Sequence, residues 1–287
     1  MKMLSFGEIL WDVYPDSKAL GGASLNLGAH AALLGGEVYL ASSVGDDELG
    51  KEALDVAKSF NIKEDFITVD KAHQTGAVIV SLSDKGIPSY EIMDNVAYDF
   101  IQTPDLRDKE IDVLAFGTLS LRHKENLETL KSLINENSFG EIYADLNVRL
   151  PHSNKDSVSF CLSHATIVKI SDEELPCMSD WVFGKALDEK EFVTCASEKY
   201  PSIKIILITK GASGSFAFLT NTKKFVFADA VPTNVVSTVG AGDSFGAAFL
   251  TKYFEGKEIS DCLHFASKIS AYVCSKKEAV PKMTTIV

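Results

Sequence analysis

Short apolar runs alternate with helix-like segments along almost the whole chain, and this alternation strongly constrains the fold. Apolar runs of strand length occur at 3–6, 38–42, 113–116, 142–144, 166–170, 203–209, 215–219 and 224–227. Segments with apolar residues three or four positions apart lie at 25–33, 49–57, 127–134, 243–253 and 259–273. The alternation predicts an α/β fold with three layers, a mostly parallel central sheet covered by helices on both faces. We expect residues 1–287 to form a single domain.

One segment, residues 75–93, breaks this alternation. Its sequence, TGAVIVSLSDKGIPSYEIM, contains two β-like runs joined by Ser-Asp-Lys-Gly, which is a hairpin turn signal. No helix separates the runs, so they cannot be neighbours in a parallel sheet. We expect a small antiparallel β lid, formed by residues 10–19 and 75–98, that shuts water out of a reaction site. An edge hairpin without a function is the alternative.

The composition argues against several classes of function. The chain has 28 Lys and Arg against 40 Asp and Glu, a formal net charge of −12, which argues against a nucleic-acid partner or an anionic membrane surface. The five cysteines lack a CxxC spacing and the six histidines an HExxH arrangement. We therefore expect reduced thiols, a cytoplasmic location and no zinc site. No apolar run approaches the length of a membrane span.

The sequence VGAGDSFGAAFL, at 239–250, places two glycines and an acid where a helix begins. Glycines before a helix let successive N–H groups point at one spot, and the helix dipole adds positive potential there. An acid in the first turn also stabilises the helix by about 0.3–1 kcal/mol, but that effect does not explain both glycines. The pattern favours an anion hole for a phosphoryl group, with Asp243 accepting a proton from an attacking hydroxyl.

Two further glycine-rich stretches have both structural and functional interpretations. GGASLNLGAHAALLGG, at 21–36, suits a tight turn and close helix packing, but the amide of Asn26 could also hold polyol hydroxyls. ILITKGASGS, at 206–215, suits a hairpin or a turn whose amides face nucleotide phosphates. Neither GxxxxGK[ST] nor GxGxxG occurs, so the chain is not predicted to be a P-loop NTPase or a dinucleotide-binding protein.

Taken in order, these motifs resemble the PfkB-type, ribokinase-like family of ATP-dependent sugar kinases. GGASLNLGAHAALLGG followed by VGDDELG is similar to the first family signature, and VGAGDSFGAAFL is similar to the second. FGEILWD, YADLNVR, KISDEEL and TKGASG resemble the intervening landmarks, so the resemblance covers almost the whole chain. It implies the ribokinase-like fold, ATP with Mg²⁺, and a lid that often also forms a dimer contact.

The resemblance also implies roles for individual residues. Asp243 would be the base, and the anion hole would consist of the backbone amides of Gly240, Ala241 and Gly242. The sugar would be bound by Asp12, Gly21, Gly22, Asn26 and Arg149. The ATP site would include Lys169, Ser171, Thr209, Gly211, Gly214 and Ser267. Mg²⁺ would be oriented by Glu174 through water, together with Asn147.

Details such as YEIMDNVAYD and FGTLSLR are most similar to the fructokinase branch. Ribokinase and 2-keto-3-deoxygluconate kinase remain alternatives. An acid sugar would need more cationic side chains near the pocket, and Arg149 and Arg122 are the candidates. From other classes, a catalytically silent sugar- or nucleotide-binding regulator stays open, and a nicotinamide-dependent oxidoreductase suits the α/β pattern but lacks its fingerprint.

The sequence departs from the family pattern near a monovalent-cation site. Ser237 stands where the family usually has aspartate, and Glu278 and Lys282 stand where glycine and often serine occur. Ser171 replaces the family's asparagine, which puts one hydrogen bond near the phosphates in doubt. We hypothesise that the Lys282 ammonium, balanced by Glu278, replaces the ion and makes the enzyme independent of potassium. The alternative is that both are solvated surface charges and the cation site has decayed.

Overall fold

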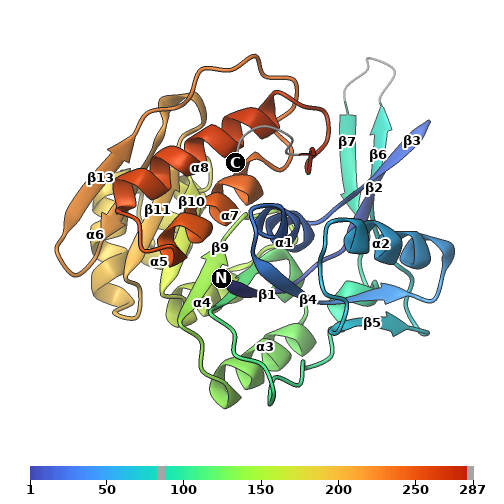
Figure 1. Ribbon diagram of the computed structural model, residues 1–287. Coiled ribbons are helices and arrows are strands. Elements are labelled where there is room, and N and C mark those ends of the chain that lie inside the picture. Colours follow the sequence, from blue (N-terminus) through green and yellow to red (C-terminus); the bar gives the residue numbers. More distant parts are fainter. Residues whose placement is uncertain (83–87, 283–287) are drawn as a thin grey trace.

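The computed structural model describes residues 1–82 and 88–282 (Figure 1). Its large sheet has nine strands in the order β13-β12-β11-β10-β9-β8-β1-β4-β5. All neighbours from β11 to β5 pair in parallel, and β12 and β13 add an antiparallel edge. The strands are β1 (Lys2–Phe6), β4 (Glu37–Gly45), β5 (Ile67–Asp70), β8 (Val113–Gly117), β9 (Glu141–Asp145), β10 (Ile167–Ser171), β11 (Ile205–Thr209), β12 (Ser215–Leu219) and β13 (Lys224–Ala228).

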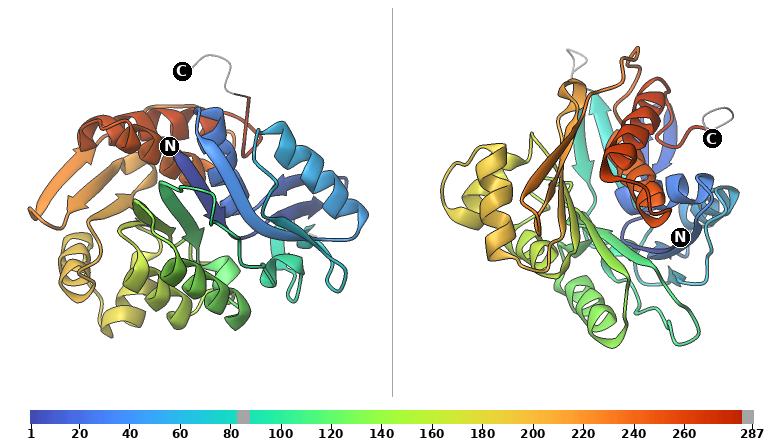
Figure 2. Two further views of the ribbon diagram at one scale, coloured as in Figure 1. Left: turned by 60° about the horizontal axis from the view of Figure 1, so that its bottom comes forward. Right: turned by 60° about the vertical axis from the view of Figure 1, so that its left-hand side comes forward.

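Helices cover both faces of this sheet, as the two views of Figure 2 show. One layer contains α1 (Ala23–Leu33), α2 (Glu48–Ser59), α7 (Ala241–Phe254) and α8 (Ile259–Cys274). The other contains α3 (Lys124–Glu136), α4 (Lys155–His164), α5 (Leu175–Phe183) and α6 (Glu189–Lys199). Successive residues of a strand point to opposite faces, so Met3 lies in the first core while Leu4 and Phe6 lie in the second. The predicted α/β fold with three layers is confirmed.

A second, smaller sheet projects beside the large one (Figure 1), with strands in the order β3-β2-β6-β7. It consists of β2 (Leu10–Tyr14), β3 (Ser17–Gly21), β6 (Gly76–Leu82) and β7 (Pro88–Ile92). The β6–β7 and β2–β3 pairs are antiparallel, whereas β2 and β6 pair in parallel. The predicted hairpin is therefore present, although its Ser-Asp-Lys-Gly turn, at 83–86, lies outside the described residues.

Among the described residues, short 3-10 helices also occur: η1 (Ala97–Asp99), η2 (Leu119–Leu121) and η3 (Gly211–Ser213). Within residues 1–82 and 88–282, no helix combines the length and the apolar composition needed to cross a membrane. Five candidate site residues lie in the loops at the carboxyl ends of β9, β10 and β11, namely Asn147, Arg149, Glu174, Gly211 and Gly214. In open α/β sheets, ligands bind at that edge.

Candidate active site

Helices α1 and α7 pack against each other, and their contact joins the two glycine-rich motifs. The Asn26 Nδ2 of α1 donates a hydrogen bond of 2.9 Å to the Asp243 Oδ2 of α7. Both side chains are buried, and Asp243 lies in the first turn of its helix. The predicted sugar-binding amide and the predicted base are therefore in direct contact.

The environment of Asp243 makes its carboxyl an effective proton acceptor near neutral pH. Burial raises the pKa of Asp243 to about 7, and the negative charge of Asp145 adds to that effect. The hydrogen bond from Asn26 and the charge of Lys169 lower the pKa and limit the rise. A general base is most effective when its pKa lies near the operating pH.

The turn before α7 presents unpaired N–H groups beside this carboxylate. Gly240 is left-handed, with φ +78°, and ends the turn that leads into the helix. In the described residues, the N–H groups of Gly240, Gly242 and Asp243 donate to no acceptor. The Ala241 N–H, which we expected to bind the same anion, donates to the Thr238 carbonyl oxygen at 3.2 Å. Gly240, Gly242 and Asp243 thus have the free N–H donors of this turn within the described residues.

A buried ion pair lies against the same turn. The Lys169 Nζ is 2.9 Å from both carboxylate oxygens of Asp145, and both side chains are buried. A Cβ placed on Gly242 would lie 3.1 Å from this Nζ, so the absence of a side chain there lets the ammonium approach the helix end. Burial opposes the charge of Lys169, but the carboxylates of Asp145 and Glu174 outweigh burial and raise its pKa.

Glu174 connects the ends of β9 and β10. Its Oε2 accepts hydrogen bonds from the Ser171 N–H at 2.6 Å and the Ser171 Oγ at 2.9 Å, and its Oε1 accepts one from the Val148 N–H. Ser171 therefore contributes a hydroxyl bond of its own where the family pattern has asparagine. Asn147, the other predicted metal residue, lies one position before Val148 with φ +38°.

The predicted sugar residues gather at the junction of β2, β3 and α1. A Cβ on Gly21 would lie 3.1 Å from the Asp12 Oδ2, so the carboxylate of Asp12 lies over this glycine. Burial raises the pKa of Asp12, and the positive charge of Arg149 partly lowers it. Arg149 itself is exposed.

Sequence reasoning missed Glu8, which fixes the start of α1. Its Oε1 accepts a 2.8 Å hydrogen bond from the Ala23 N–H, and its side chain is only 2% exposed. Gly22 has φ +110°, and a Cβ there would lie 2.4 Å from the Glu8 carbonyl oxygen, so this position requires glycine. The available signal was an acid two residues after the end of a buried strand.

The predicted nucleotide residues lie along β11 and α8. Thr209 ends β11, and its carbonyl oxygen accepts the Asp172 N–H at 2.9 Å. Gly211 and Gly214 both have positive φ, +48° and +88°, in the turn that leads to β12. Ser267 is buried on α8, which packs on β12 and β13.

Comparison with protein families matches residues 7–286 to the pfkB family of carbohydrate kinases. The chain belongs to this family. The predicted membership and the predicted enzyme class, a carbohydrate kinase, are confirmed.

Curated relatives of this pfkB family kinase include plant fructokinases. It is 27% identical over 320 residues to probable fructokinase-3 of Arabidopsis thaliana, covering 99% of this chain and 88% of that protein. It is 28% identical over 315 residues to a fructokinase of Solanum tuberosum, covering 99% and 92%.

Solved structures of the same fold include two bacterial fructokinases. The fructokinase of Xylella fastidiosa with bound ATP matches with a TM-score of 0.84 and 20% identity, over 98% of this chain and 94% of that chain. The fructokinase of Vibrio cholerae O395, in a fructose-, ADP- and calcium-bound form, matches with a TM-score of 0.83 and 21% identity, over 99% and 95%. These likenesses confirm the predicted ribokinase-like fold.

The expected replacement of a monovalent cation in this pfkB family kinase is not supported by the geometry. Glu278 and Lys282 are both exposed, and within the described residues no ion pair joins them. The Ser237 Oγ accepts the Val239 N–H at 3.2 Å and so closes a local turn. The geometry therefore favours the alternative of solvated surface charges, and independence of potassium stays a prediction.

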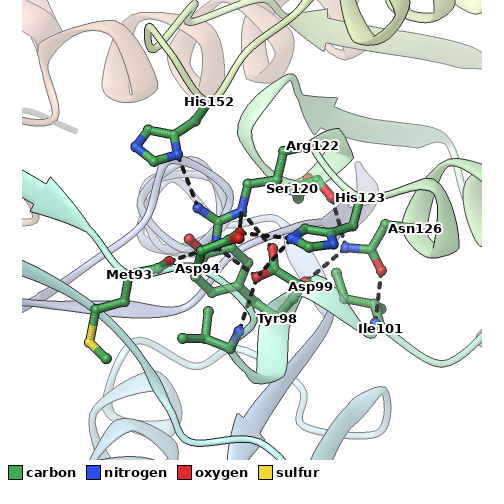
Figure 3. Close-up of polar contacts among 11 residues, drawn as sticks. Met93, Asp94, Tyr98, Asp99, Ile101, Ser120, Arg122, His123, Asn126 and His152 are labelled. Carbon is green, nitrogen blue, oxygen red and sulfur yellow. Dashed lines mark hydrogen bonds and ion pairs between the residues drawn. The ribbon is translucent and has the colours of Figure 1, made fainter.

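A cluster of Asp94, Asp99 and His123 near the small sheet has the composition of a metal site, with potential ligand atoms within 4.8 Å of one another. Figure 3 shows that the Arg122 guanidinium already lies among these groups. Its Nε and Nη2 donate to the two oxygens of Asp99 at 2.8 and 2.7 Å, and Nη2 also donates to the Met93 carbonyl oxygen at 2.7 Å. A cation would be repelled there, so the cluster is an ion-pair network that fixes the segment after β7.

Proposed function

We propose that this kinase uses ATP to phosphorylate a primary hydroxyl of fructose. The observation that carries the proposal is the carboxylate of Asp243, with a pKa of about 7, beside free N–H groups at the start of α7. The fructokinase relatives and the solved fructokinases, whose descriptions name ATP, ADP and fructose, support the same choice.

In the proposed reaction, the sugar hydroxyl gives its proton to Asp243 while its oxygen attacks the γ-phosphorus of ATP. The bond from the γ-phosphorus to the β,γ-bridging oxygen breaks, and ADP leaves. The N–H groups of Gly240, Gly242 and Asp243, the positive end of the α7 dipole and the Lys169 ammonium stabilise the charge on the phosphoryl oxygens. The Ala241 amide joins them only if its bond to Thr238 opens.

Glu174 and Asn147 would hold Mg²⁺, which neutralises phosphate charge when it is bound. Oxygen ligands and retained waters are what Mg²⁺ prefers. The Glu174 oxygens already accept three hydrogen bonds from the protein, so their remaining lone pairs suit a contact through water. The residues therefore fit a hydrated ion.

The charges near the pocket favour a neutral sugar. Arg122, one of two candidate cations for an acid sugar, is bound to Asp99 and to the Met93 carbonyl, and its side chain is only 4% exposed. The other, Arg149, faces the negative charge of Asp12. A sugar carboxylate would meet that acid with a single cation to compensate, so 2-keto-3-deoxygluconate is the less suitable substrate.

The groups around the pocket also suit hydroxyls. The Asn26 Oδ1 is buried and has no partner within the described residues, so it can accept a hydrogen bond from a sugar hydroxyl. The Asp12 carboxylate can accept further hydroxyl protons. Ribose offers the same kind of groups, and ribokinase activity is therefore the alternative that the assay must include.

The small sheet β3-β2-β6-β7 is proposed as a lid within a single domain of residues 1–287, since β2 carries Asp12 to the site. Pairing of two lids in a homodimer is part of the same proposal. Light scattering of the purified chain tests the dimer, and a monomeric mass at assay concentration contradicts it.

A coupled assay of ADP release across fructose, ribose, glucose and 2-keto-3-deoxygluconate tests the substrate. We expect the highest kcat/KM with fructose, and a preference for 2-keto-3-deoxygluconate would refute the charge argument. Asp243→Asn should lower kcat by about 10²–10⁴-fold while fructose still binds. A silent regulator built on this fold would bind the ligands but show no turnover in the unaltered chain.

A further inference from the structure

His30 lies in α1 on the side that faces the C-terminal segment, residues 275–282. Its side chain is fully buried, and its Nε2 is 2.9 Å from the Ala279 carbonyl oxygen. Because a carbonyl oxygen can only accept, Nε2 carries the proton and Nδ1 is bare. Nδ1 has no partner within the described residues. Burial lowers the pKa of His30 to about 4, so the ring is neutral at ordinary assay pH.

The opposite side of the same carbonyl lies against the anion-hole turn. A Cβ placed on Gly240 would be 2.4 Å from the Ala279 oxygen and 3.0 Å from its carbonyl carbon. The Ala279 carbonyl group thus contacts both His30 of α1 and Gly240, the residue that precedes α7. The N–H groups of Val236 and Ser237, earlier in the same turn, donate to the Cys274 carbonyl oxygen at 2.8 and 3.2 Å.

The rest of the C-terminal segment offers limited support for this contact. Lys276, Lys277 and Glu278 are exposed, so the three residues before Ala279 lie in solvent. After it, Val280 packs on the core and the Lys282 carbonyl oxygen accepts the Tyr272 hydroxyl at 2.8 Å. The His30 bond is the hydrogen bond that ties Ala279 itself to the layer of α1 and α7.

We propose that His30 is a positioning residue for phosphoryl transfer. By holding Ala279 against Gly240, it fixes the turn whose N–H groups receive the γ-phosphoryl group. His30 does not act on the reacting atoms, and the inference rests on the proposed role of this turn as the anion hole. A displacement of about 1 Å in a positioned catalytic group can lower the rate by about 10²-fold, so a loosened turn would reduce kcat.

The experiment compares two substitutions that fill nearly the same volume. His30→Leu removes the donor, whereas His30→Gln keeps an N–H donor at nearly the reach of Nε2. We expect His30→Leu to lower kcat by about 10–100-fold with the Kd for fructose, measured by calorimetry, unchanged within about twofold. We expect His30→Gln to recover most of kcat. Hydrogen exchange should become faster in peptides covering 236–242 and 275–282 of the Leu variant only.

Leu130→Ala, in a fully buried position on α3 in the opposite helix layer, is the control for general destabilisation and should leave kcat unchanged at low temperature. If His30→Leu does not fold, His30→Asn is measured instead, because its shorter amide cannot reach Ala279. A kcat within twofold of the unaltered chain, or equal losses in the Leu and Gln variants, would overturn the proposal. Full activity of Asp243→Asn would instead overturn the proposed function, while the exchange data would still report on the His30 contact.

Discussion

Asn26→Leu removes the hydrogen bond that Asn26 donates to Asp243 at 2.9 Å. Leucine has nearly the same shape as asparagine, so the substitution changes the bond more than the packing. That bond lowers the pKa of Asp243 by favouring its charged form. Its loss should therefore raise the pKa, and a base that is protonated cannot accept a proton. We expect the acidic limb of the pH profile to move to higher pH.

The size of the change follows from the energy of the bond. A hydrogen bond to a charged group contributes about 1.5–3 kcal/mol, and about 1.4 kcal/mol corresponds to one pH unit, so the pKa should rise by about 1 to 2 pH units. With a pKa of about 7, about three quarters of the Asp243 carboxyls are ionised at pH 7.5. After the substitution, the ionised fraction at that pH falls to between about a quarter and about a thirtieth.

The assay is kcat against pH from 5.5 to 10 at saturating fructose and ATP, so that weaker sugar binding does not enter. We expect kcat of Asn26→Leu to be lower by about 3–25-fold at pH 7.5 and to approach the value of the unaltered chain at high pH. Asn126→Leu is the matched control, because Asn126 is also buried. Its side-chain amide makes hydrogen bonds to backbone groups of Tyr98, Ser120 and Ile101, and not to Asp243. This control substitution should destabilise the fold but leave the acidic limb of the kcat–pH profile at the same pH.

Two results would refute this reasoning. An acidic limb at the same pH in Asn26→Leu and in the unaltered chain would mean that Asp243 is not the group that titrates in the profile. A loss of kcat that persists undiminished at pH 10 would mean that Asn26 acts on the substrate and not on the pKa of Asp243.

Three further substitutions test other parts of the structure. Folding raises the pKa of Asp243 from 3.8 to about 7, so the unaltered chain loses stability as the pH rises through that range. Asp243→Asn removes the carboxylate and should therefore raise the free energy of unfolding near pH 8 by up to about 4 kcal/mol. Urea unfolding near pH 4 should show no difference between the two chains. Gly240→Ala should lower both kcat, at least tenfold, and the Tm. Gly240 has φ +78°, and a Cβ there would clash with the Ala279 carbonyl oxygen. The resulting strain should be about 1–3 kcal/mol. Arg122→Met should lower the free energy of unfolding by about 3–5 kcal/mol by leaving Asp99 unpaired, and a loss below 1 kcal/mol would contradict the buried ion pair.

The sequence predicted the elements whose burial leaves a clear pattern. Runs such as 113–116 are apolar because both faces of a central parallel strand are covered. It did not predict β5, a short strand at the edge of the large sheet, and it placed only the first part of β3 in the expected lid, since β3 is mostly exposed and neither strand shows a buried apolar run. Edge strands are stabilised by pairing with a neighbour, which is a long-range property.

Sequence reasoning selected Asn26 and Asp243 because each is an unusual polar residue in a glycine-rich motif, and the structure brings the two side chains together. Contacts that depend on the path of a loop were not predictable. The Lys282 ammonium was expected to replace a monovalent ion with Glu278 beside it, but both side chains are exposed. His30 gave no signal beyond a polar residue among small apolar ones, since its partner is a backbone carbonyl 249 positions away.

The contrast between two buried carboxyls explains why Asp243, and not Asp145, suits the proposed role of the base. Asp145 and Asp243 both lie near Lys169, and each is at most 9% exposed. The Lys169 Nζ donates hydrogen bonds of 2.9 Å to both carboxylate oxygens of Asp145, so the negative charge of Asp145 is compensated. Asp243 receives one amide hydrogen bond and the repulsion of Asp145. Neighbouring carboxyls in unlike environments are how acid and base roles separate, and here the unpaired one lies at the start of α7.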